Sequence, residues 1–463
     1  MSNRRFPFSG SGSGERLKFY PNMKAIIAEK PSVGMDIARV VGATDKKDGY
    51  CTGNGYMVTW ALGHLVSLAM PGAYGYTKTS AENLPMLPDP FRLVSRQVRT
   101  DKGMVTDIAA ANGMVTVTLS RANGALPALL DIPIVKETGG VPLGTGPYVL
   151  AGTGENLALE ARSDWWQGNA LPRDTIPLRA IQEADDLIHA FDTRDIALVS
   201  TDLTGTNALG FSGSFAAVDY PTSTMLYVGF NTADGPCRSA QVRQALLRGF
   251  DRAAVSTAQF SRHAQPAALP VSPASPLYDE ALAQTLDYAP QAMEPLLTAA
   301  GYTRADGVWQ KEGRPLALTF VAPNNNADRL AAAETLAANL TDAGLDWDQY
   351  LQALTAGEFD LYLGEGRLTA DFDLTAFLTP GGALNYGKYS DAEALNRLSA
   401  FRAAVGQWRT EPARQLYEYL AGQPPFAVIC FKNWSVLTQW SRIDGLTPAQ
   451  QNIFHQFSDW KIT

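Results

Sequence analysis

Short apolar runs recur along the chain of 463 residues, and their patterns predict β-strands. The clearest alternation is at residues 114–119, where Val and Leu occupy every second position from Val115 onward. Residues 224–230 and 316–321 combine β-branched, aromatic and alternating apolar side chains, which are typical of strands. Residues 426–431 form a continuous apolar run directly after two prolines, which indicates a buried strand.

Between these runs, apolar residues fall at helical spacing. One helix face is predicted by residues spaced i, i+3, i+4 and i+7, namely Val242, Ala245, Leu246 and Gly249. The sequence Ser-Asp-Ala-Glu at residues 390–393 matches a capping box. In the helix that it starts, four side chains are predicted to face the core: Leu395, Leu398, Phe401 and Val405. Pro412 suits the first turn of another helix, with Leu416 and Leu420 behind it. Interleaved strands and helices predict an α/β protein with mixed sheets.

A separate strand–turn–helix pattern lies near the N-terminus. Residues 24–28 predict a buried strand, and Ser32 is placed to cap a helix over residues 33–41. Glu29 then lies at the carboxyl end of a strand, where open α/β sheets place their ligands. Residues 55–62 mix alternation with aromatic side chains and predict a second strand.

Charge divides the chain into unlike parts. Residues 1–22 and residues 23–103 each carry a net charge of +3, and the remainder carries −14, which gives the overall −8. The acidic remainder argues against a nucleic-acid surface there, because phosphate contacts need clustered Lys and Arg. A basic head on an acidic body is consistent with two domains that have different partners, or with two pieces of different origin.

The first residues and the apolar runs bear on localisation. Residues 1–22 lack the central apolar stretch of a secretory signal peptide, and residues 9–14 alternate Ser and Gly as flexible segments do. No apolar run reaches the roughly 18 residues that a membrane-spanning helix needs. Taken literally, this chain is expected to stay in the cytoplasm.

Cysteine, histidine and tryptophan predict no specific site. The three cysteines are odd in number and far apart, which implies neither a metal site nor a disulfide framework: Cys51, Cys237 and Cys430. The four histidines are scattered, and no metal cluster is expected: His64, His189, His263 and His455. Tryptophans can stack on sugars, but packing in a core or between lobes is favoured for Trp165, Trp166, Trp434, Trp440 and Trp460.

Residues 23–112 resemble the opening of bacterial topoisomerase III. The resemblance rests on "MKAIIAEKPSVGMDIARVVGA", "GYMVTWALGHLVSL" and "LPMLPDPFRLV", which occur in order. It implies a Rossmann-like toprim domain, in which a Glu after the first strand and a later D-x-D-x-E cluster hold Mg²⁺. Glu29 matches the first position, but no D-x-D-x-E occurs in this chain. A single carboxylate does not hold Mg²⁺, so we expect no topoisomerase catalysis, no cofactor and an orphan carboxylate at Glu29.

Residues 114–463 resemble the extracellular solute-binding proteins of family five, the peptide and nickel receptors of ABC importers. The resemblance rests on an ordered set of strings that includes "VTLSRANGALPALLDIPIV", "GTGPYVL", "STMLYVGFNTADGP" and "FDLYLGEGRLTADFDLTAFL". It implies a periplasmic-binding-protein-like body of two lobes, with the larger binding lobe at about residues 235–431. The lobes of such receptors close over a small solute in the cleft between them.

The resemblance also implies binding residues and partners. In peptide-binding members an Asp in an "ADY"-like string pairs with the free amine of the ligand, and Asp371 matches that position. The alternative for Asp371 is a carboxylate that makes only local hydrogen bonds. Arg367 is a weaker candidate, for a ligand carboxylate, and Asn385 and Tyr386 could line the cleft. The implied partners are an oligopeptide or similar solute and the membrane subunits of an ABC importer. The family implies an extracellular or periplasmic lipoprotein.

Two departures from the family pattern lead us to expect impaired binding. The signal, the first strands and most of the small second domain should precede residue 114, and another strand should lie near residues 344–347. One wall of the cleft is then mostly intact and the opposite wall damaged, and the receptor is expected to bind ligand weakly or not at all. We expect an α/β chain in three parts: a flexible extension at residues 1–22, a truncated toprim fragment at residues 23–113, and an N-terminally incomplete receptor at residues 114–463.

The abrupt change near Gly113, with no linker, favours a chimera, because natural domain boundaries fall in exposed linkers. Sequencing source DNA across codons 84–130 with reads that span both flanks tests this hypothesis. A junction observed repeatedly would establish one fused gene, and failure to recover it would establish two genes.

Overall fold

The computed structural model describes the chain in ranges of unequal length. These are residues 24–28, 35, 38–47, 50–54, 56–60, 66–68, 93–95, 105–111, 114–130, 144–153, 156–168, 170–205, 208–305, 308–324, 326–336, 341–342, 354 and 357–463. The chain forms two compact units, Met1–Ser120 and Arg121–Thr463. Each is described by itself.

The first unit contains one small sheet and two hairpins. In the sheet, β1 (Lys24–Ala28) pairs in parallel with β4 (Tyr56–Trp60), followed by β3 (Tyr50–Gly53) and β2 (Asp45–Lys47). The hairpins are β5 (Val66–Leu68) with β6 (Leu93–Ser95), and β7 (Val105–Ala111) with β8 (Met114–Leu119). A small apolar cluster of Ala38, Ala43, Cys51 and Val58 lies in this unit. The β7–β8 hairpin pairs residues from both sides of the predicted joint, and Gly113 itself lies outside the described residues.

The second unit is built on one large mixed sheet in the order β12-β21-β13-β20-β18-β19, with β14 paired to β21. Its strands are β12 (Leu198–Thr201), β13 (Phe215–Phe230), β14 (Ala264–Pro266), β18 (Thr319–Val321), β19 (Thr341–Asp342), β20 (Leu361–Arg367) and β21 (Phe426–Gln439). Three smaller sheets complete the described part of this unit. One contains β9 (Tyr148–Ala151), β10 (Ala158–Ala161) and β11 (Thr175–Pro177), and another contains β15 (Thr303–Ala305), β16 (Val308–Lys311) and β17 (Arg314–Pro315). The third pairs β22 (Ile443–Asp444) with β23 (Lys461–Ile462).

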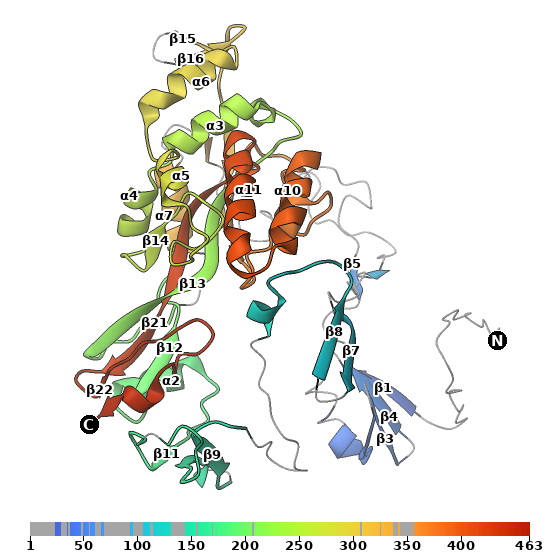
Figure 1. Ribbon diagram of the computed structural model, residues 1–463, viewed down its shortest axis with the longest axis vertical. Helices are drawn as coiled ribbons and strands as arrows, with labels where there is room; N and C mark the ends of the chain where they lie inside the picture. Colours follow the sequence, from blue (N-terminus) through green and yellow to red (C-terminus); the bar gives the residue numbers. More distant parts are fainter. Residues whose placement is uncertain are drawn as a thin grey trace, which may run out of the picture. The chain divides into compact units, whose positions relative to one another are not determined.

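Helices flank this sheet (Figure 1). They are α2 (Ala184–Asp192), α3 (Ala240–Gly249), α4 (Arg252–Ala258), α5 (Glu280–Gln284), α6 (Met293–Ala299), α7 (Ala327–Leu336), α9 (Thr375–Leu378), α10 (Ala392–Ala403) and α11 (Thr410–Gly422). Short 3₁₀ helices are η3 (Leu126–Leu129), η5 (Pro236–Arg238), η6 (Pro290–Ala292), η7 (Gly406–Arg409) and η8 (Phe457–Asp459).

Alternation along the central strands builds two cores on opposite faces of the sheet. Along β13, Met225 and Tyr227 belong to one apolar cluster, whereas Leu226, Val228 and Phe230 belong to the other. The first cluster includes residues of α10 and α11, and the second includes residues of α3, α4 and α7. Because side chains alternate across a strand, one sequence buries apolar residues against helices on both sides. We call this sandwich, at about residues 225–431, the large lobe.

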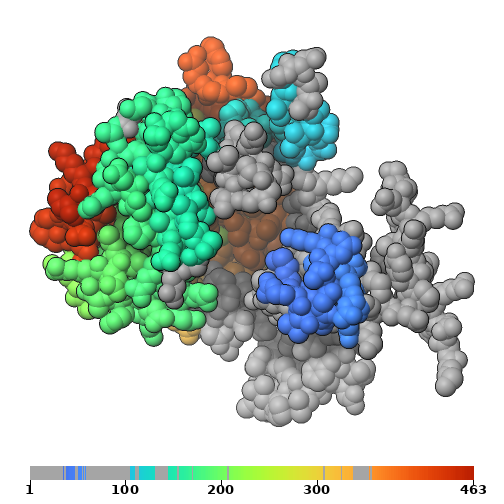
Figure 2. Space-filling view, turned by 90° about the horizontal axis from the view of Figure 1, so that it is seen from below, coloured from blue at the N-terminus to red at the C-terminus, as the bar shows by residue number. Residues whose placement is uncertain are grey.

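A second, smaller body lies at the other end of the long strands. It comprises β9–β12, α2, the first half of β13, the last half of β21 and the C-terminal β22 and β23, and we call it the small lobe. Its own apolar cluster is centred on Phe191, Val199 and Leu437. Residues of β9–β11 and of the C-terminal segment share one face of the surface (Figure 2), and the rings of Tyr148 and Phe457 lie 5.6 Å apart there.

Most of the predicted elements are confirmed. Strands occupy residues 24–28, 56–60 and 114–119. The predicted strands at 224–230 and 426–431 are the inner parts of the longer β13 and β21. Val242, Ala245 and Leu246 are buried on α3, and Leu416 and Leu420 are buried on α11, whose first turn contains Pro412. Residues 38–41 are helical, as predicted, whereas Ser32 and Glu29 lie outside the described residues.

Four details of the prediction are wrong. The N-cap of α10 is Asp391, whose carboxylate accepts from the Ala394 amide, and not Ser390. Val405 lies beyond the end of α10 and is 61% exposed, because the helix stops at Ala403. The strand predicted at 316–321 begins only at Thr319. Trp166 and Trp440 are exposed rather than core residues, whereas Trp460 is buried.

Removal of a large side chain from the small-lobe core tests whether that lobe has a core of its own. Phe191 is 1% exposed and contacts Phe211 and Phe215. Phe191→Ala should lower the free energy of unfolding in urea by about 3–5 kcal/mol, through lost transfer free energy and the cavity left behind. Val405→Ala, at an exposed position, should change it by less than about 0.5 kcal/mol. Equal effects of the two changes would contradict this packing.

Candidate functional site

Two long antiparallel strands, β13 and β21, are the only described sheet strands with residues in both lobes, and they run side by side from one lobe to the other (Figure 1). The register of this ladder shifts between Pro221 and Met225, and again between Leu226 and Tyr227 inside the large lobe. Residues 222–224 are therefore unpaired in this ladder opposite Lys432. A register shift bends a strand locally and lets the two lobes take different directions. We call this region, residues 221–225 of β13 and 431–433 of β21, the hinge.

The hinge contains polar side chains that are buried in the protein. Lys432 is only 1% exposed, and its ammonium Nζ lies 2.8 Å from Asp202 Oδ2, 3.5 Å from Glu365 Oε2 and 3.2 Å from the Thr204 carbonyl oxygen. Asp202 follows β12 in the small lobe, whereas Glu365 belongs to β20 in the large lobe. A buried ammonium needs such partners, because an unpaired charge in the interior is costly. Lys432 therefore links the two lobes electrostatically.

Hydroxyl and carboxyl groups hold the strands together around the register shift. The Thr222 hydroxyl donates to the Lys432 carbonyl at 2.7 Å, and the Ser435 hydroxyl donates to Asp219 Oδ1 at 2.6 Å. His263 Nδ1 lies 2.8 Å from the other Asp219 oxygen. Burial raises the pKa of Asp328 on α7, and the neighbouring Lys432 ammonium opposes that rise. The hinge is thus held by polar contacts whose partners lie far apart in sequence.

The Asp371 loop follows β20 and precedes α9. Asp371 is 3% exposed, and its carboxylate accepts from Asn123 Nδ2 at 2.8 Å and from the Thr369 hydroxyl. Arg409 Nη2 donates to the Asp371 carbonyl at 2.7 Å, and the Arg409 guanidinium lies over the Phe401 ring at 4.3 Å. The carboxylate is therefore held by groups of the same chain in this conformation.

The second carboxylate of this loop is paired with arginines. Asp373 Oδ2 lies 3.4 Å from Arg402 Nε and 3.8 Å from Arg121 Nη2. Burial lowers the pKa of Arg402 and of Arg409, and the coulombic attraction of Asp371 and Asp373 opposes this. Two guanidinium groups thus pair with the Asp373 carboxylate, and a third, from Arg409, binds the Asp371 backbone carbonyl.

The other predicted binding residues are spread over nearby elements. Arg367 ends β20, opposite Thr224, and is exposed. Asn385 is half-buried, and its amide closes a loop through bonds to Thr379 and Tyr389. The Tyr386 ring packs edge-on against Tyr362, with centroids 5.8 Å apart. The described hydrogen bonds join Asp371 to Asn123 and Thr369 rather than to these three residues.

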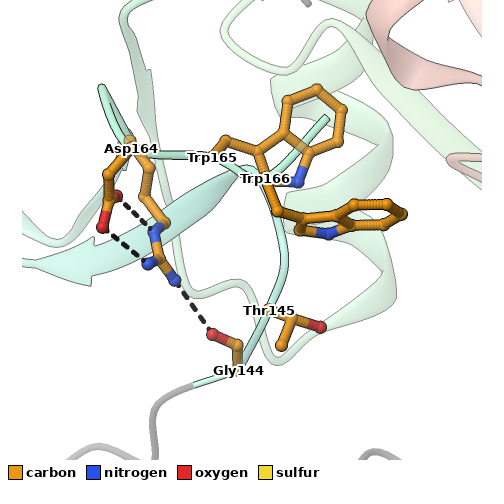
Figure 3. A pocket seen from close by; sticks show the side chains of 6 residues that line it. Gly144, Thr145, Asp164, Trp165 and Trp166 are labelled. Carbon is orange, nitrogen blue, oxygen red and sulfur yellow. Dashed lines mark hydrogen bonds and ion pairs between the residues drawn. The ribbon is translucent and has the colours of Figure 1, made fainter. Parts of the chain in front are cut away.

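A shallow pocket of about 450 Å³ lies on the small lobe and is lined by Trp165 and Trp166 (Figure 3). At its edge, the Arg162 guanidinium is held by Asp164 at 3.0 and 3.1 Å and by the Gly144 carbonyl at 3.0 Å. Trp165 is half-buried and Trp166 is 72% exposed. The arginine has its partners already, so the pocket offers mainly aromatic surface.

The described residues form neither a metal site nor a membrane-spanning helix. In the part of the chain that the structure describes, no group of three or more His, Cys, Asp or Glu side chains is placed to hold a metal ion. Over the same residues, no helix has the length and hydropathy needed to cross a bilayer. Cys51, Cys237 and Cys430 are all buried free thiols.

Four residues with these contacts were not predicted from the sequence: Asn123, Lys432, Asp202 and Glu365. Asn123 lies in one of the strings that carried the family resemblance, and a buried role for it could not be seen there. Lys432 directly follows the apolar run 426–431, and a lone Lys next to that run was the one available signal. Its partners Asp202 and Glu365 are separated from it by long stretches of sequence and carry no such signal.

Solved structures with this two-lobed fold resemble the chain. The nickel ABC transporter protein from Bacillus halodurans is 19% identical with a TM-score of 0.61, over 75% of this chain and 77% of that one. HbpA2 from Haemophilus parasuis is 16% identical with a TM-score of 0.60, over 76% and 75%. The oligopeptide-binding protein AppA from Bacillus subtilis, solved with a nonapeptide, is 19% identical with a TM-score of 0.50, over 78% of each chain. At these identities the likeness shows the fold.

Residues 76–385 match the model of the bacterial extracellular solute-binding proteins, family 5, middle. The chain belongs to this family. The predicted family and the predicted two-lobed mixed-sheet fold are thereby confirmed. The family 5 match begins upstream of Gly113, and the boundaries predicted at residues 23–113, 114–463 and 235–431 stay predictions.

The chain is also similar to DNA topoisomerase 3, over a short stretch. The identity is 58% over 73 residues with the enzyme of Shouchella clausii and 52% over 71 residues with that of Bacillus subtilis. Each match covers 15% of this chain, and the chain spans about a tenth of the length of these curated relatives. The similarity supports the interpretation as a chimera of a topoisomerase-like segment and a family 5 receptor.

Replacement of the buried hinge lysine tests its role as the link between the lobes. Lys432→Met leaves Asp202 and Glu365 without their counter-charge, and should lower the free energy of unfolding in urea by about 3–5 kcal/mol. The triple change that adds Asp202→Asn and Glu365→Gln should recover part of this loss, because no unpaired charge then remains. Lys461→Met, at an exposed position, is the matched control. A Lys432 variant as stable as that control would contradict the link.

Proposed function

We propose that the receptor body binds a small solute between its two lobes and delivers it to the membrane subunits of an ABC importer. The observation that carries this proposal is the family 5 match over residues 76–385. The hinge supports it, because two crossing strands with a register shift allow the lobes to close over a ligand. A binding role is favoured over catalysis for this body.

The proposed ligand is a short peptide or a related solute with a free amino group. One structural neighbour was solved with a nonapeptide, which supports a peptide, and another is named as a nickel transporter protein. Asp371 is the proposed partner of the ligand ammonium, since a carboxylate in a dry cleft binds a cation far more strongly than in water. Arg367 is the proposed partner of a ligand carboxylate, with Asn385 and Tyr386 along the wall of the cleft. The family description places its members outside the cell, and we propose that compartment for a receptor of this type.

Weak binding is part of the proposal. Asp371 is already held by Asn123 and Thr369. A ligand must therefore replace an existing hydrogen bond to this carboxylate. That replacement reduces affinity without changing the ligand class.

A topoisomerase remnant is the second candidate function, favoured only by the 58% identity over 73 residues. Strand passage is not proposed, because the chain contains no D-x-D-x-E and Glu29 would be the sole matching carboxylate. Incubation with negatively supercoiled plasmid and Mg²⁺ should leave the plasmid supercoiled. Relaxation that Glu29→Gln abolishes would instead establish a catalytic role for this segment.

Calorimetric titration with tri-alanine tests the proposed ligand class. The full chain should bind tri-alanine with a Kd of about 0.1–1 mM, and N-acetylation of the peptide should weaken binding at least about tenfold, because the ammonium is lost. Asp371→Asn should have the same effect, whereas Asp444→Asn, at an exposed position, should have none. Equal binding of the free and acetylated peptides would contradict the role of Asp371, and micromolar binding would contradict the proposed weak affinity.

A further inference from the structure

Residues 121–130, the first of the second unit, are docked at the C-terminal end of α10. The Gly124 amide donates to the Arg402 carbonyl at 2.7 Å. A Cβ atom at Gly124 would collide with the Ala404 carbonyl oxygen, so only glycine allows this approach. The segment therefore has a defined seat on the large lobe.

Asn123 places an N–H donor on the Asp371 carboxylate. Its side chain is 8% exposed, and Nδ2 donates to Asp371 Oδ2 at 2.8 Å. The other amide atom, Oδ1, accepts from the Ala125 backbone N–H at 2.9 Å, which fixes the orientation of the amide. Asp371 itself is 3% exposed. The Asn123 amide thus supplies the hydrogen bond that a ligand ammonium would supply, and covers the oxygen that would receive it.

The rest of the docked segment adds little to hold it in place. Arg121 reaches Asp373 at 3.8 Å, but its side chain is 50% exposed, and Asp373 is also paired with Arg402. The short helix η3 has no buried residue, and Leu130 is 45% exposed. A segment with few buried apolar contacts opens at a small cost in free energy. Of residues 121–130, Asn123 and Ala125 alone are buried, at 8% and 6% exposed, so few apolar contacts add to the hydrogen bonds of Asn123 and Gly124.

We propose that residues 121–130 form an internal plug, which competes with the ligand for the Asp371 carboxylate and must leave its seat before a ligand ammonium can bind there. This proposal rests on the proposed function, in which Asp371 binds the ligand amine. The apparent affinity for an amine ligand is then the intrinsic affinity reduced by the fraction of molecules with the plug undocked. Ligand binding in turn favours the undocked state.

Two variants undock the plug by different means. Gly124→Val places a branched side chain against the Ala404 carbonyl, and Asn123→Ala removes the amide that covers Asp371. Ala128→Ser, at an exposed position of η3, is the matched control. Thermal unfolding should show that all three variants are folded. If Gly124→Val does not fold, Asn123→Ala still tests the proposal.

The first measurement is the rate at which a carbodiimide couples Asp371 to glycine ethyl ester, followed by mass spectrometry. Loss of a hydrogen bond to a charged acceptor should raise this rate at least about tenfold in Gly124→Val and in Asn123→Ala over Ala128→Ser. The second measurement is tri-alanine affinity, which should rise by a similar factor. The third is hydrogen exchange of residues 121–130 in the unchanged protein, which should become faster when tri-alanine is added.

The outcomes separate the plug from the proposed function. Unchanged labelling of Asp371 in both undocking variants, or slower exchange of residues 121–130 on adding tri-alanine, overturns the plug alone. If labelling is faster but no variant binds tri-alanine, the proposed function is overturned. The proposed competition between plug and ligand is then overturned as well. Faster labelling, tighter binding and ligand-accelerated exchange together support the plug.

Discussion

The pairing of β13 with β21 is the constraint on which the receptor body depends. These two strands carry residues of both lobes, and their alternating side chains supply both faces of the large-lobe core and part of the small-lobe core. Between the cores the apolar pattern gives way to Lys432, Thr222 and Ser435, all buried and all hydrogen-bonded. A hydrophobic contact is non-directional, whereas an ion pair and hydroxyl bonds have preferred geometry. The hinge therefore has a preferred angle, held by Asp202 from one lobe and Glu365 from the other.

The Asp371 loop is connected to this constraint through β20. Glu365, near the end of that strand, contacts the hinge lysine, and the loop begins directly after Arg367. The same short stretch of chain therefore carries an interlobe contact and the carboxylate proposed to bind ligand. In the present conformation Asn123 and Thr369 bind that carboxylate. Arginines pair with the neighbouring Asp373 carboxylate and bind the Asp371 carbonyl. Binding and closure must therefore begin from a site that is internally satisfied, which is the physical basis for the weak affinity proposed.

Much of the secondary structure could be predicted from the sequence, because helices and strands depend on residues that are close together in the chain. The helical spacing of Val242, Ala245 and Leu246 and the run at residues 426–431 correspond to buried faces. Errors arose where neighbouring residues compete, since Ser390 and Asp391 can both cap a helix and only the backbone decides between them. Contacts across long stretches could not be predicted, because Asn123 meets Asp371 over 248 positions and Lys432 meets Asp202 over 230. The exposure of Trp166 likewise depends on which distant segments pack against the small lobe, and no local sequence pattern indicates those segments.

The central claim is that this body closes about the β13–β21 hinge on a small solute. Pulsed electron–electron double resonance tests it by measuring the distance between spin labels on the two lobes. Nitroxide labels at Asp185→Cys on α2 and Ser399→Cys on α10 report on the two lobes, and the three native cysteines are buried. Saturating short peptides should shorten the mean distance between the labels and narrow its distribution. A distance distribution that no short peptide changes would contradict a receptor that closes on its ligand.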